Sequence, residues 1–520
     1  MGKHKSQMRM VSWDAETTRQ GRRAIRIAAA KEAARLRKDW KTAGEGEAAG
    51  KGLAKRTFGV GGEARARNLR GTGLVGRPVT REASSFTLAG AFPWVSQSGL
   101  GTNRAYIGNV VDGGGMWCLD PWEAYARDMI SGMSCVLIGT VGTGKSTTVK
   151  AWVKRLVQAG RQAIIMSDAK GEWGIVARAL SAAGKDPEIT VGVPGRVLNP
   201  LDSGRRPSTR MDEAGGEVPI SDEEWVRMVR SRRSTMMKTI VQILSGVSMT
   251  GDEKLALSRA ITVASDRCGE DIAGMSPQTS IAEAAAAAPT IPDVIEALRN
   301  PSEETEGFTA GAGRGVANTL TELVEGDLKG LFDGRSTVTF DESLPMLVFN
   351  TRPLRTLSPQ ARKIASHCVS SWAESVFTNK DSGQRVAVYE EGWENLDDVA
   401  SLERMVAQWK LARDYGLFNI LILHKLSDLN RAGDEGSRAR ELAVSLLADT
   451  DIRVVHRQKS DQLRATADLL RLTASEREEI SRAPKGTALW KVGELEGRMV
   501  KTVRTKLEGQ LFDTDHAMTS

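Results

Sequence analysis

Residues 139–146 bring glycines, a lysine and a hydroxyl side chain together at a spacing that suits phosphate binding. Gly139, Gly144, Lys145 and Ser146 fill the pattern G-x-x-x-x-G-K-[ST]. In such a loop the backbone N–H groups surround a phosphate chain, the lysine reaches its β and γ oxygens, and the hydroxyl ligates Mg²⁺. The residues expected to contact the nucleotide are Gly139, Thr140, Val141, Gly142, Thr143, Gly144, Lys145, Ser146 and Thr147.

A plain glycine turn is the alternative interpretation of this loop. The chain contains 52 glycines among 520 residues, and an accidental match to the pattern has a chance on the order of a few per cent. An apolar strand expected over 135–138 precedes the loop, and a helix expected over 146–159 follows it, as a phosphate loop requires. We therefore expect the chain to bind ATP together with Mg²⁺.

Hydrolysis needs a second acidic site on a neighbouring strand, one that supports Mg²⁺ and prepares a water molecule. The apolar stretch 385–389 ends in Glu390 and Glu391. We expect Glu390 to bind Mg²⁺ together with Ser146, and Glu391 to act as the general base. A strand that simply ends in a polar turn is the alternative, and the phosphate loop upstream favours the catalytic interpretation.

Further polar residues follow predicted strands. Asp168 and Glu172 come after the strand expected over 163–166, at the edge where parallel sheets bind ligands, so we expect them to face the nucleotide. A turn capped by Asp168 is an equal alternative. His424 ends the strand expected over 419–424 and is a candidate sensor of the γ-phosphate, with an ordinary histidine at a strand end as the alternative.

Three arginines are candidates for an arginine finger, a guanidinium side chain that reaches the nucleotide bound by a neighbouring subunit. Arg413, Arg453 and Arg457 lie near predicted core strands or their connecting helices. Such a finger stabilises the negative charge that develops on the phosphoryl group. A surface salt bridge is the alternative for each of them.

Alternating strand and helix patterns surround these residues. They extend from the phosphate loop to about residue 202 and return from about residue 346, which is typical of a parallel sheet. The segment between them carries helical patterns, with capping boxes at Ser221–Glu224 and Thr250–Glu253. It therefore predicts a helical lobe inserted between strands. Short apolar runs separated by glycines within residues 85–122 predict a β-rich lead-in.

The charge is unevenly distributed along the chain. Residues 1–70 hold 18 lysines and arginines against 7 acidic residues, which leaves 54 basic and 58 acidic residues in the remainder. A basic amphipathic helix is expected over 14–41. This arm could contact DNA or an anionic membrane surface, and docking to the body or to a neighbouring subunit is the alternative.

The apolar stretches, the cysteines and the histidines bear on the cellular location of the protein and on disulfide and metal sites. No apolar stretch is long enough to span a membrane, and residues 1–10 lack the core of a signal peptide. The four cysteines are far apart and the five histidines show no ligand spacing, so we expect neither a disulfide framework nor a metal cluster of these residues. These features predict a cytoplasmic protein, with peripheral association at the inner face of the cell membrane as an addition.

Several motifs together resemble one family, the ATPases of type IV secretion and conjugative transfer (VirB/TraC-type assembly motors), in a compact actinobacterial-like form. The chain also resembles the wider group of ring-forming DNA translocases, which insert a strand between the phosphate-loop strand and the second acidic motif. The matching segments follow one another in order over roughly residues 85–505: YIGNVVDGGGMWCLDPW, VGTGKST, SDAKGEW, RVLNPLD, YEEGW, LARDYGL and LILHKLSDL.

The resemblance implies an ATP-hydrolysing motor that works as a homo-oligomeric ring, expected to be a hexamer, with proteins of the secretion and conjugation machinery as partners. It places Arg413 first among the finger candidates. The chain departs from the family pattern at Glu390, where the family has Asp, and at His424, where it has Thr. A DNA translocase that pumps DNA directly is a second hypothesis, favoured by the basic arm. An ATP-binding scaffold without turnover is a third, and Lys145 and Glu391 argue against it.

The expected fold is α/β: a RecA-like P-loop core with an inserted all-helical lobe and a small β-rich N-terminal lead-in. The expected parts are an arm (1–57), the lead-in (58–130), the first part of the core (131–202), the helical lobe (203–340), the second part of the core (341–505) and a tail (506–520).

Overall fold

The computed structural model divides into two units, Met1–Phe92 and Pro93–Ser520, of which the second contains nearly all the residues that can be described. The predicted arm and the predicted strands within residues 85–96 lie outside the described part, apart from Lys31. The described residues are 31, 99–100, 105–211, 216–301, 310–338, 341, 343–377, 383–390, 399–410, 412–424 and 438–512.

An 11-stranded sheet runs through the second unit, and its central strands are parallel. In spatial order these are β11 (Ile452–His456), β3 (Ser134–Ile138), β10 (Leu417–Leu423), β9 (Arg385–Tyr389), β4 (Gln162–Ser167), β8 (Met346–Asn350) and β5 (Glu188–Thr190). The strand β10 lies between the phosphate-loop strand β3 and the acidic strand β9. The fold is therefore the expected RecA-like P-loop arrangement, including the intervening strand that the resemblance implied.

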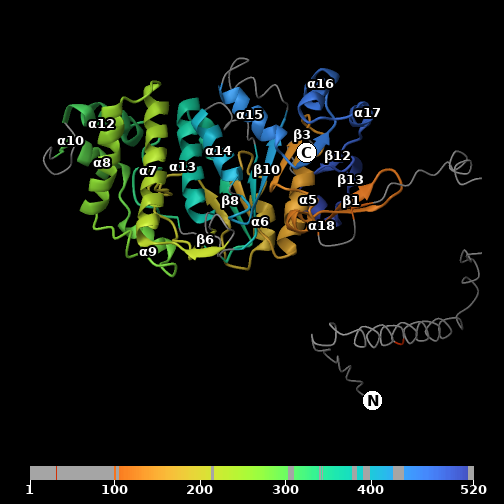
Figure 1. The fold of residues 1–520 in the computed structure, drawn as a ribbon, viewed down its shortest axis with the longest axis horizontal. Coiled ribbons are helices and arrows are strands. Elements are labelled where there is room, and N and C mark those ends of the chain that lie inside the picture. The colour runs from red at the N-terminus through yellow and green to blue at the C-terminus, as the bar shows by residue number, and fades with distance from the viewer. Residues whose placement is uncertain are drawn as a thin grey trace, which may run out of the picture. The chain divides into compact units, whose positions relative to one another are not determined.

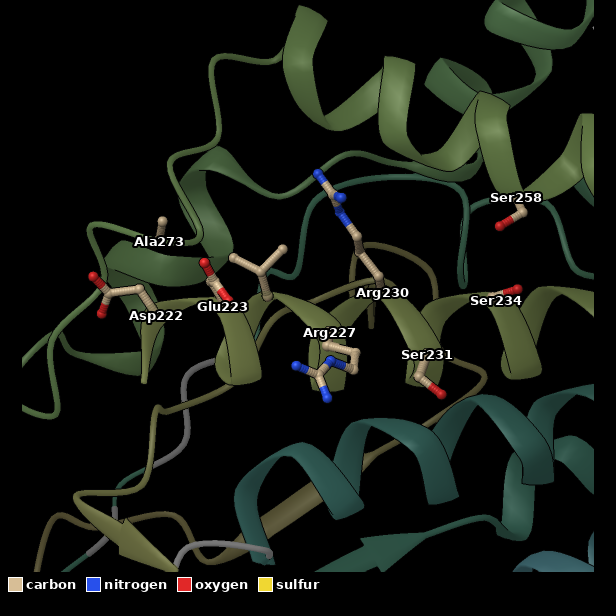
Figure 2. Close-up of a pocket in the computed structure, with 9 residues that line it drawn as sticks. Asp222, Glu223, Arg227, Arg230, Ser231, Ser234, Ser258 and Ala273 are labelled. Carbon is tan, nitrogen blue, oxygen red and sulfur yellow. The ribbon is translucent and has the colours of Figure 1, made fainter. Parts of the chain in front are cut away.

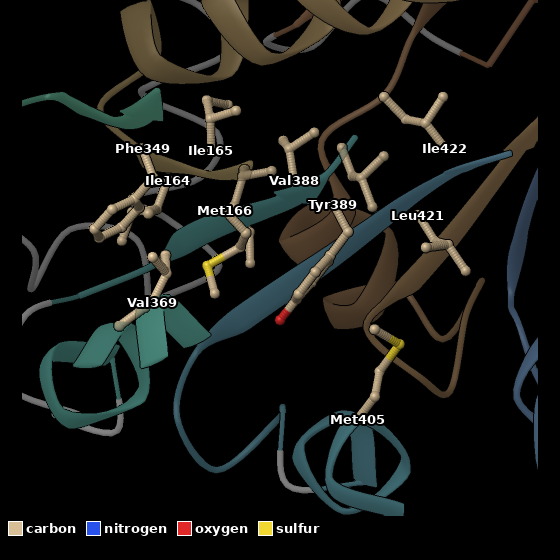
Figure 3. Packing of buried hydrophobic residues seen from close by; sticks show 14 of the residues in the cluster. Ile164, Ile165, Met166, Phe349, Val369, Val388, Tyr389, Met405, Leu421 and Ile422 are labelled. Carbon is tan, nitrogen blue, oxygen red and sulfur yellow. The ribbon is translucent and has the colours of Figure 1, made fainter. Parts of the chain in front are cut away.

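Helices connect the parallel strands and cover both faces of the sheet. They are α5 (Lys145–Gln158), α6 (Gly174–Leu180), α13 (Pro359–Phe377), α14 (Val399–Lys410) and α15 (Arg438–Ala448). Because such crossovers are right-handed and the chain reverses its direction across the sheet, α5 and α6 lie on one face and the other three on the opposite face. Figure 3 shows the resulting alternation: Val388 points away from α13 and α14, whereas Tyr389 points towards Val369 and Met405 on those helices.

Helix α5 is anchored by its buried tryptophan. The Trp152 indole N–H donates to the Leu119 carbonyl oxygen at 2.8 Å, and its ring meets Phe418 and Trp490 edge-on at centroid distances of 5.6 and 5.2 Å. Such contacts fix the rotation of a helix as well as its depth. The residues at the start of α5 therefore have a defined direction.

The antiparallel part of the sheet contains the described strands of the predicted β-rich lead-in. Strands β12 (Thr487–Val492) and β13 (Arg498–Thr502) extend the sheet from β11, and β1 (Tyr106–Val110) and β2 (Met116–Cys118) extend it further. The N-terminal strands thus complete the edge of the main sheet. A lead-in strand needs a partner with free backbone groups, and the C-terminal hairpin supplies it.

Residues 506–512, the described part of the interval predicted as a tail, pack on the core. They contain α18 (Lys506–Leu511), which begins with a capping box between Thr505 and Glu508. The buried Glu508 carboxylate accepts two hydrogen bonds from Arg155 of α5, at 3.1 and 2.6 Å. This helix therefore packs on the phosphate-loop helix.

The inserted lobe is mainly helical, as predicted, and packs through α7 against α13 (Figure 1). Its helices are α7 (Asp222–Ser245), α8 (Gly251–Arg267), α9 (Ile281–Ala287), α10 (Ile291–Arg299) and α12 (Ala310–Glu325). The Ser221 hydroxyl caps α7, and the predicted capping box of Thr250 and Glu253 is confirmed. The prediction of an all-helical lobe is wrong in one respect, because β6 (Thr209–Met211) and β7 (Glu217–Pro219) form a hairpin there.

The turn Asn199–Asp202 joins the lobe to the sheet. The Asn199 side chain donates to the Pro289 carbonyl oxygen at 2.9 Å, and one carboxylate oxygen of Asp202 accepts from Ser336 at 2.6 Å and from the Trp372 indole at 3.1 Å. The Leu201 carbonyl oxygen accepts from Arg233, whose guanidinium forms a buried ion pair with Glu270. This turn therefore holds segments of the lobe and of the core in one network.

All four cysteines are free thiols, in agreement with the prediction of no disulfide framework. Among the helices of the described residues, none combines the length and the apolar character that spanning a membrane requires.

Asp202 gives a prediction about pH. Burial raises the pKa of its carboxyl group to about 6, so the folded state holds a proton that the unfolded state releases near pH 3.8. The stabilising effect of this proton is fully present below pH 3.8 and is lost as the pH rises through 6. Asp202→Asn keeps the shape and one acceptor oxygen for Ser336 and Trp372. Relative to this variant, the wild type should lose up to about 3 kcal/mol of unfolding free energy between pH 4 and 7.

The measurement is urea unfolding of both proteins at a series of pH values. The control is Asp341→Asn, at an aspartate whose pKa is lowered to about 2 by Lys185. The stability that this carboxylate contributes is present above pH 3.8 and is lost only as the pH falls through 2, so wild type and Asp341→Asn should give nearly parallel profiles between pH 4 and 7. Parallel pH profiles for the wild type and Asp202→Asn would contradict the assignment.

Candidate functional site

The loop between β3 and α5 has the conformation that glycines permit. Gly142 and Gly144 have φ angles of +80° and +102°, in the left-handed region that disfavours other residues. A Cβ atom on Gly144 would also lie 3.0 Å from the backbone nitrogen of Gly486. The glycines therefore allow both the turn and the close approach of a second segment.

Segments far away in sequence hold this loop in place. The Arg457 carbonyl oxygen accepts from the Thr140 backbone N–H at 3.2 Å and from its hydroxyl at 3.1 Å. The Gly486 N–H donates to the Thr143 carbonyl oxygen at 2.9 Å, and the Gly486 carbonyl oxygen accepts from Thr502 at 2.9 Å. The end of β11 and the β12–β13 hairpin thus clamp both halves of the loop.

Lys145 is directed along the loop. It is 5% exposed, and its ammonium group donates to the carbonyl oxygens of Gly139 and Thr140, the latter at 3.0 Å. His456 lies behind the same loop and is fully buried. Burial, reinforced by the charge of Lys145, lowers the pKa of His456 to about 3, so this histidine is neutral near pH 7 and adds no positive charge beneath the loop.

The structure brings Ser146 and Glu390 together. Ser146 is the second residue of α5, directly after Lys145, and Glu390 directly follows β9. The serine hydroxyl donates to Glu390 Oε1 at 3.4 Å. Glu390 is 5% exposed, and burial raises its pKa, while the charge of Lys150 and the Trp173 indole oppose this rise. A hydroxyl and a carboxylate oxygen facing each other in a nearly dry position fit a hard cation such as Mg²⁺.

Asp168 has the alternative role of a turn cap. It is fully buried, and its two carboxylate oxygens accept the backbone N–H groups of Glu172 at 3.0 Å and Trp173 at 2.8 Å. The structure thus shows the turn-cap role that was the alternative for Asp168, and the expectation that it also faces the nucleotide stays a prediction. Glu172 likewise pairs with Lys150 of α5, at 2.5 Å.

The other predicted residues lie around the same edge of the sheet. The register pairs Leu423 with Ile138, so the half-buried His424 is level with Gly139, the first residue of the loop. Thr147 is half-buried in the first turn of α5, and Val141 at the tip of the loop is 81% exposed. Glu391 lies outside the described residues.

The three arginines differ in their surroundings. Arg453 donates to the Thr450 carbonyl oxygen at 3.0 Å and so is committed within its own chain. Arg457 is exposed beside the loop that its carbonyl oxygen supports. Arg413 is exposed, and within the described part of the chain its guanidinium has no ion pair or hydrogen bond.

Sequence reasoning missed Trp173, Lys150 and His456. A signal existed for Lys150, because it lies four residues after Ser146 and therefore on the same face of α5, among apolar neighbours. Trp173 belongs to the SDAKGEW motif that the sequence analysis singled out, without a role of its own. Nothing local distinguishes His456 from any other residue that ends a strand.

A cavity of about 610 Å³ in the inserted lobe is separate from this site. Figure 2 shows its lining, with Arg227 and Arg230 projecting from α7 towards different sides. Its lining residues are Asp222, Glu223, Val226, Arg227, Arg230, Ser231, Ser234, Ser258 and Ala273. None of the predicted site residues belongs to it. In the described ranges, no three histidine, cysteine or acidic side chains gather in a way that could hold a metal ion.

Comparison with known proteins gives similarity in structure only. No family model and no curated protein matches the sequence. The structure of VirB4 of Thermoanaerobacter pseudethanolicus matches with a TM-score of 0.62 and 20% identity, over 79% of this chain and 100% of that chain. The bacterial conjugative coupling protein TrwBΔN70 matches with a TM-score of 0.44 and 14% identity, over 78% of this chain and 90% of that chain. The first match shows that the fold is shared, and the second is too distant to add to it.

A substitution at Gly139 tests how closely the loop packs against His456. A Cβ atom at this position would lie 2.5 Å from the Cβ atom of His456, which is fixed by β11 and cannot yield. Gly139→Ala should therefore destabilise the fold by about 1–3 kcal/mol and displace the loop. Nucleotide affinity, measured by fluorescence anisotropy of a labelled ATP analogue, should fall by about tenfold, which corresponds to 1.4 kcal/mol of that strain.

The control is Gly311→Ala, at a glycine of α12 with open space around it. It should leave the affinity unchanged and not destabilise the fold, because alanine is the better helix former. If Gly139→Ala bound nucleotide as tightly as Gly311→Ala, the described packing of the loop against His456 would be wrong.

Proposed function

We propose that the chain is an Mg²⁺-dependent ATPase and the motor of a type IV secretion or conjugative transfer apparatus. The observation that carries the enzymatic part is the approach of Ser146 to Glu390 at 3.4 Å, beside a glycine loop that ends in Lys145. The transfer part is supported by the ordered motifs and by the fold shared with VirB4, a type IV secretion ATPase.

In this proposal each residue has one task. Backbone N–H groups within residues 141–145 and the Lys145 ammonium bind the phosphates, for which Lys145 leaves the carbonyl oxygens it contacts in the loop. Ser146 and Glu390 would hold Mg²⁺, which would supply positive charge against the phosphates. Glu391 accepts a proton from water as the water oxygen bonds to the γ-phosphorus. The bond from that phosphorus to the bridging oxygen breaks, which leaves ADP and phosphate.

In a ring of subunits, a neighbouring subunit would contribute an arginine to the site. Arg413 follows α14, and its exposed side chain is available to a neighbouring subunit. A guanidinium supplied from a neighbour stabilises the transition state and couples turnover to assembly. Direct pumping of DNA rests on the basic residues 1–57, which lie outside the described part, so it remains the alternative.

Substitution of two residues tests the enzymatic part. Lys145→Ala should reduce steady-state phosphate release by about 10²-fold or more, because it removes a charge aimed at the transferred phosphoryl group. Glu391→Gln should reduce it by about 10²-fold or more through loss of the general base, with nucleotide binding retained. Circular dichroism should be unchanged in both.

The exposed pair Lys185 and Asp341 provides a control at a distance from the loop. Lys185→Ala removes the same charge as Lys145→Ala and should hydrolyse ATP at the wild-type rate. Wild-type rates in Lys145→Ala or Glu391→Gln would refute the catalytic assignment. A wild-type protein that binds ATP but releases no phosphate would indicate the scaffold hypothesis.

Mass photometry tests the ring. Addition of a non-hydrolysable ATP analogue to the wild type should shift the mass to a closed oligomer, expected to be a hexamer. In a separate assay with ATP, Arg413→Ala should lower the rate of phosphate release by about 10³-fold. Arg438→Ala, at an exposed arginine paired with Glu403, should have no such effect. A strict monomer under all nucleotide conditions would rule out action in trans.

A further inference from the structure

Trp173 links the turn after β4 to the acidic residue of β9. Its side chain is fully buried, and its indole N–H donates to Glu390 Oε2 across 217 residues of sequence. Its backbone N–H donates to Asp168 at 2.8 Å, so the same residue is fixed by its main chain at the start of α6. Trp173 is therefore held on one side and holds Glu390 on the other.

This bond decides which way the Glu390 carboxylate faces. The terminal torsion of a glutamate is broad, so a carboxylate without partners samples many orientations. With Oε2 engaged by the indole, Oε1 is directed at the Ser146 hydroxyl, 3.4 Å away. The indole is a donor only, so it can engage the ionised carboxylate but can neither ligate a cation nor accept a proton.

The indole ring is in turn held from α5. The Lys150 ammonium lies 5.9 Å from the centre of the Trp173 ring and forms its 2.5 Å ion pair with Glu172, the residue before the tryptophan. Lys150 is one helical turn after Ser146, so both side chains belong to the same face of α5. The helix that carries the serine thus also supports the ring that orients the glutamate.

We propose that Trp173 is a positioning residue for metal binding: its indole N–H orients Glu390 so that Oε1 and the Ser146 hydroxyl form one oxygen pair for Mg²⁺. This inference rests on the proposed ATPase function and goes beyond it, since it assigns the geometry of the cation site to a residue that does not touch the cation. Partners of this kind, one step removed from the metal, are worth about 10- to 100-fold in metal affinity.

The test measures metal binding without turnover. Trp173→Phe keeps an aromatic ring in the buried position and removes only the donor. Binding of Mn²⁺, which replaces Mg²⁺ because its free form is visible by electron paramagnetic resonance, is titrated in the presence of ADP. The variant should bind Mn²⁺ about tenfold more weakly than the wild type. ADP affinity without metal should be unchanged.

A matched control is available in the lobe. Trp225 of α7 is 1% exposed, and in the described structure its indole N–H has no hydrogen-bond partner, so Trp225→Phe makes the same change at a buried ring without a polar role. It should bind Mn²⁺ like the wild type. Equal Mn²⁺ affinity in Trp173→Phe and Trp225→Phe would overturn the inference.

A double-mutant cycle separates positioning from general damage to the fold. In a Glu390→Gln background, Trp173→Phe should weaken Mn²⁺ binding no further, because the indole acts through that carboxylate. An additional tenfold loss there would show that the tryptophan has only a structural role. Failure of the proposed function gives a different result, namely wild-type protein that shows neither Mn²⁺ binding with ADP nor phosphate release.

Discussion

The glycines of the phosphate loop have no side chains that could hold the loop in shape. Lys145 and Thr140 contribute side-chain hydrogen bonds, and further contacts must come from other segments. In this protein the loop is therefore supported from behind by the Arg457 carbonyl oxygen, the Gly486 N–H and the buried His456. These supports come from β11, which lies beside β3, and from the β12–β13 hairpin, which lies beside β11. The order of strands at this side of the sheet therefore places each supporting segment next to the loop.

A second requirement explains the other side of the sheet. The buried carboxyl groups of Asp168 and Glu390 need partners there, because burial disfavours their charged form and raises the pKa of both. Backbone N–H groups of the turn oppose this rise at Asp168, whereas Lys150 and the Trp173 indole oppose it at Glu390. Positive charge and donors are thus distributed between α5 and the turn after β4, on both sides of the acidic strand.

The sequence was sufficient for the features that depend on neighbouring residues. The loop from Gly139 to Ser146, the acidic end of β9 and the caps of the lobe helices are local patterns, and the structure contains each of these elements where it was expected. The sequence was insufficient where the partner of a residue lies far away along the chain. Nothing near Trp173 points to Glu390, and the role of β1 at the sheet edge depends on β13, almost four hundred residues later. Asp168 is an intermediate case, since its donors lie only four and five residues ahead.

The hydrogen bonds that hold the loop come from residues much later in the chain, and this determines when the loop acquires its shape during synthesis. Every residue of the glycine loop has been synthesised by position 146, but its supports at Arg457, Gly486 and Thr502 emerge more than 300 residues later. A nascent chain therefore carries the loop over that whole interval without the contacts that shape it. Closing such a long segment is entropically unfavourable until the final strands pair. The loop thus acquires the last of these contacts only after Thr502 has been synthesised, so a chain that stops before this residue has the motif without them.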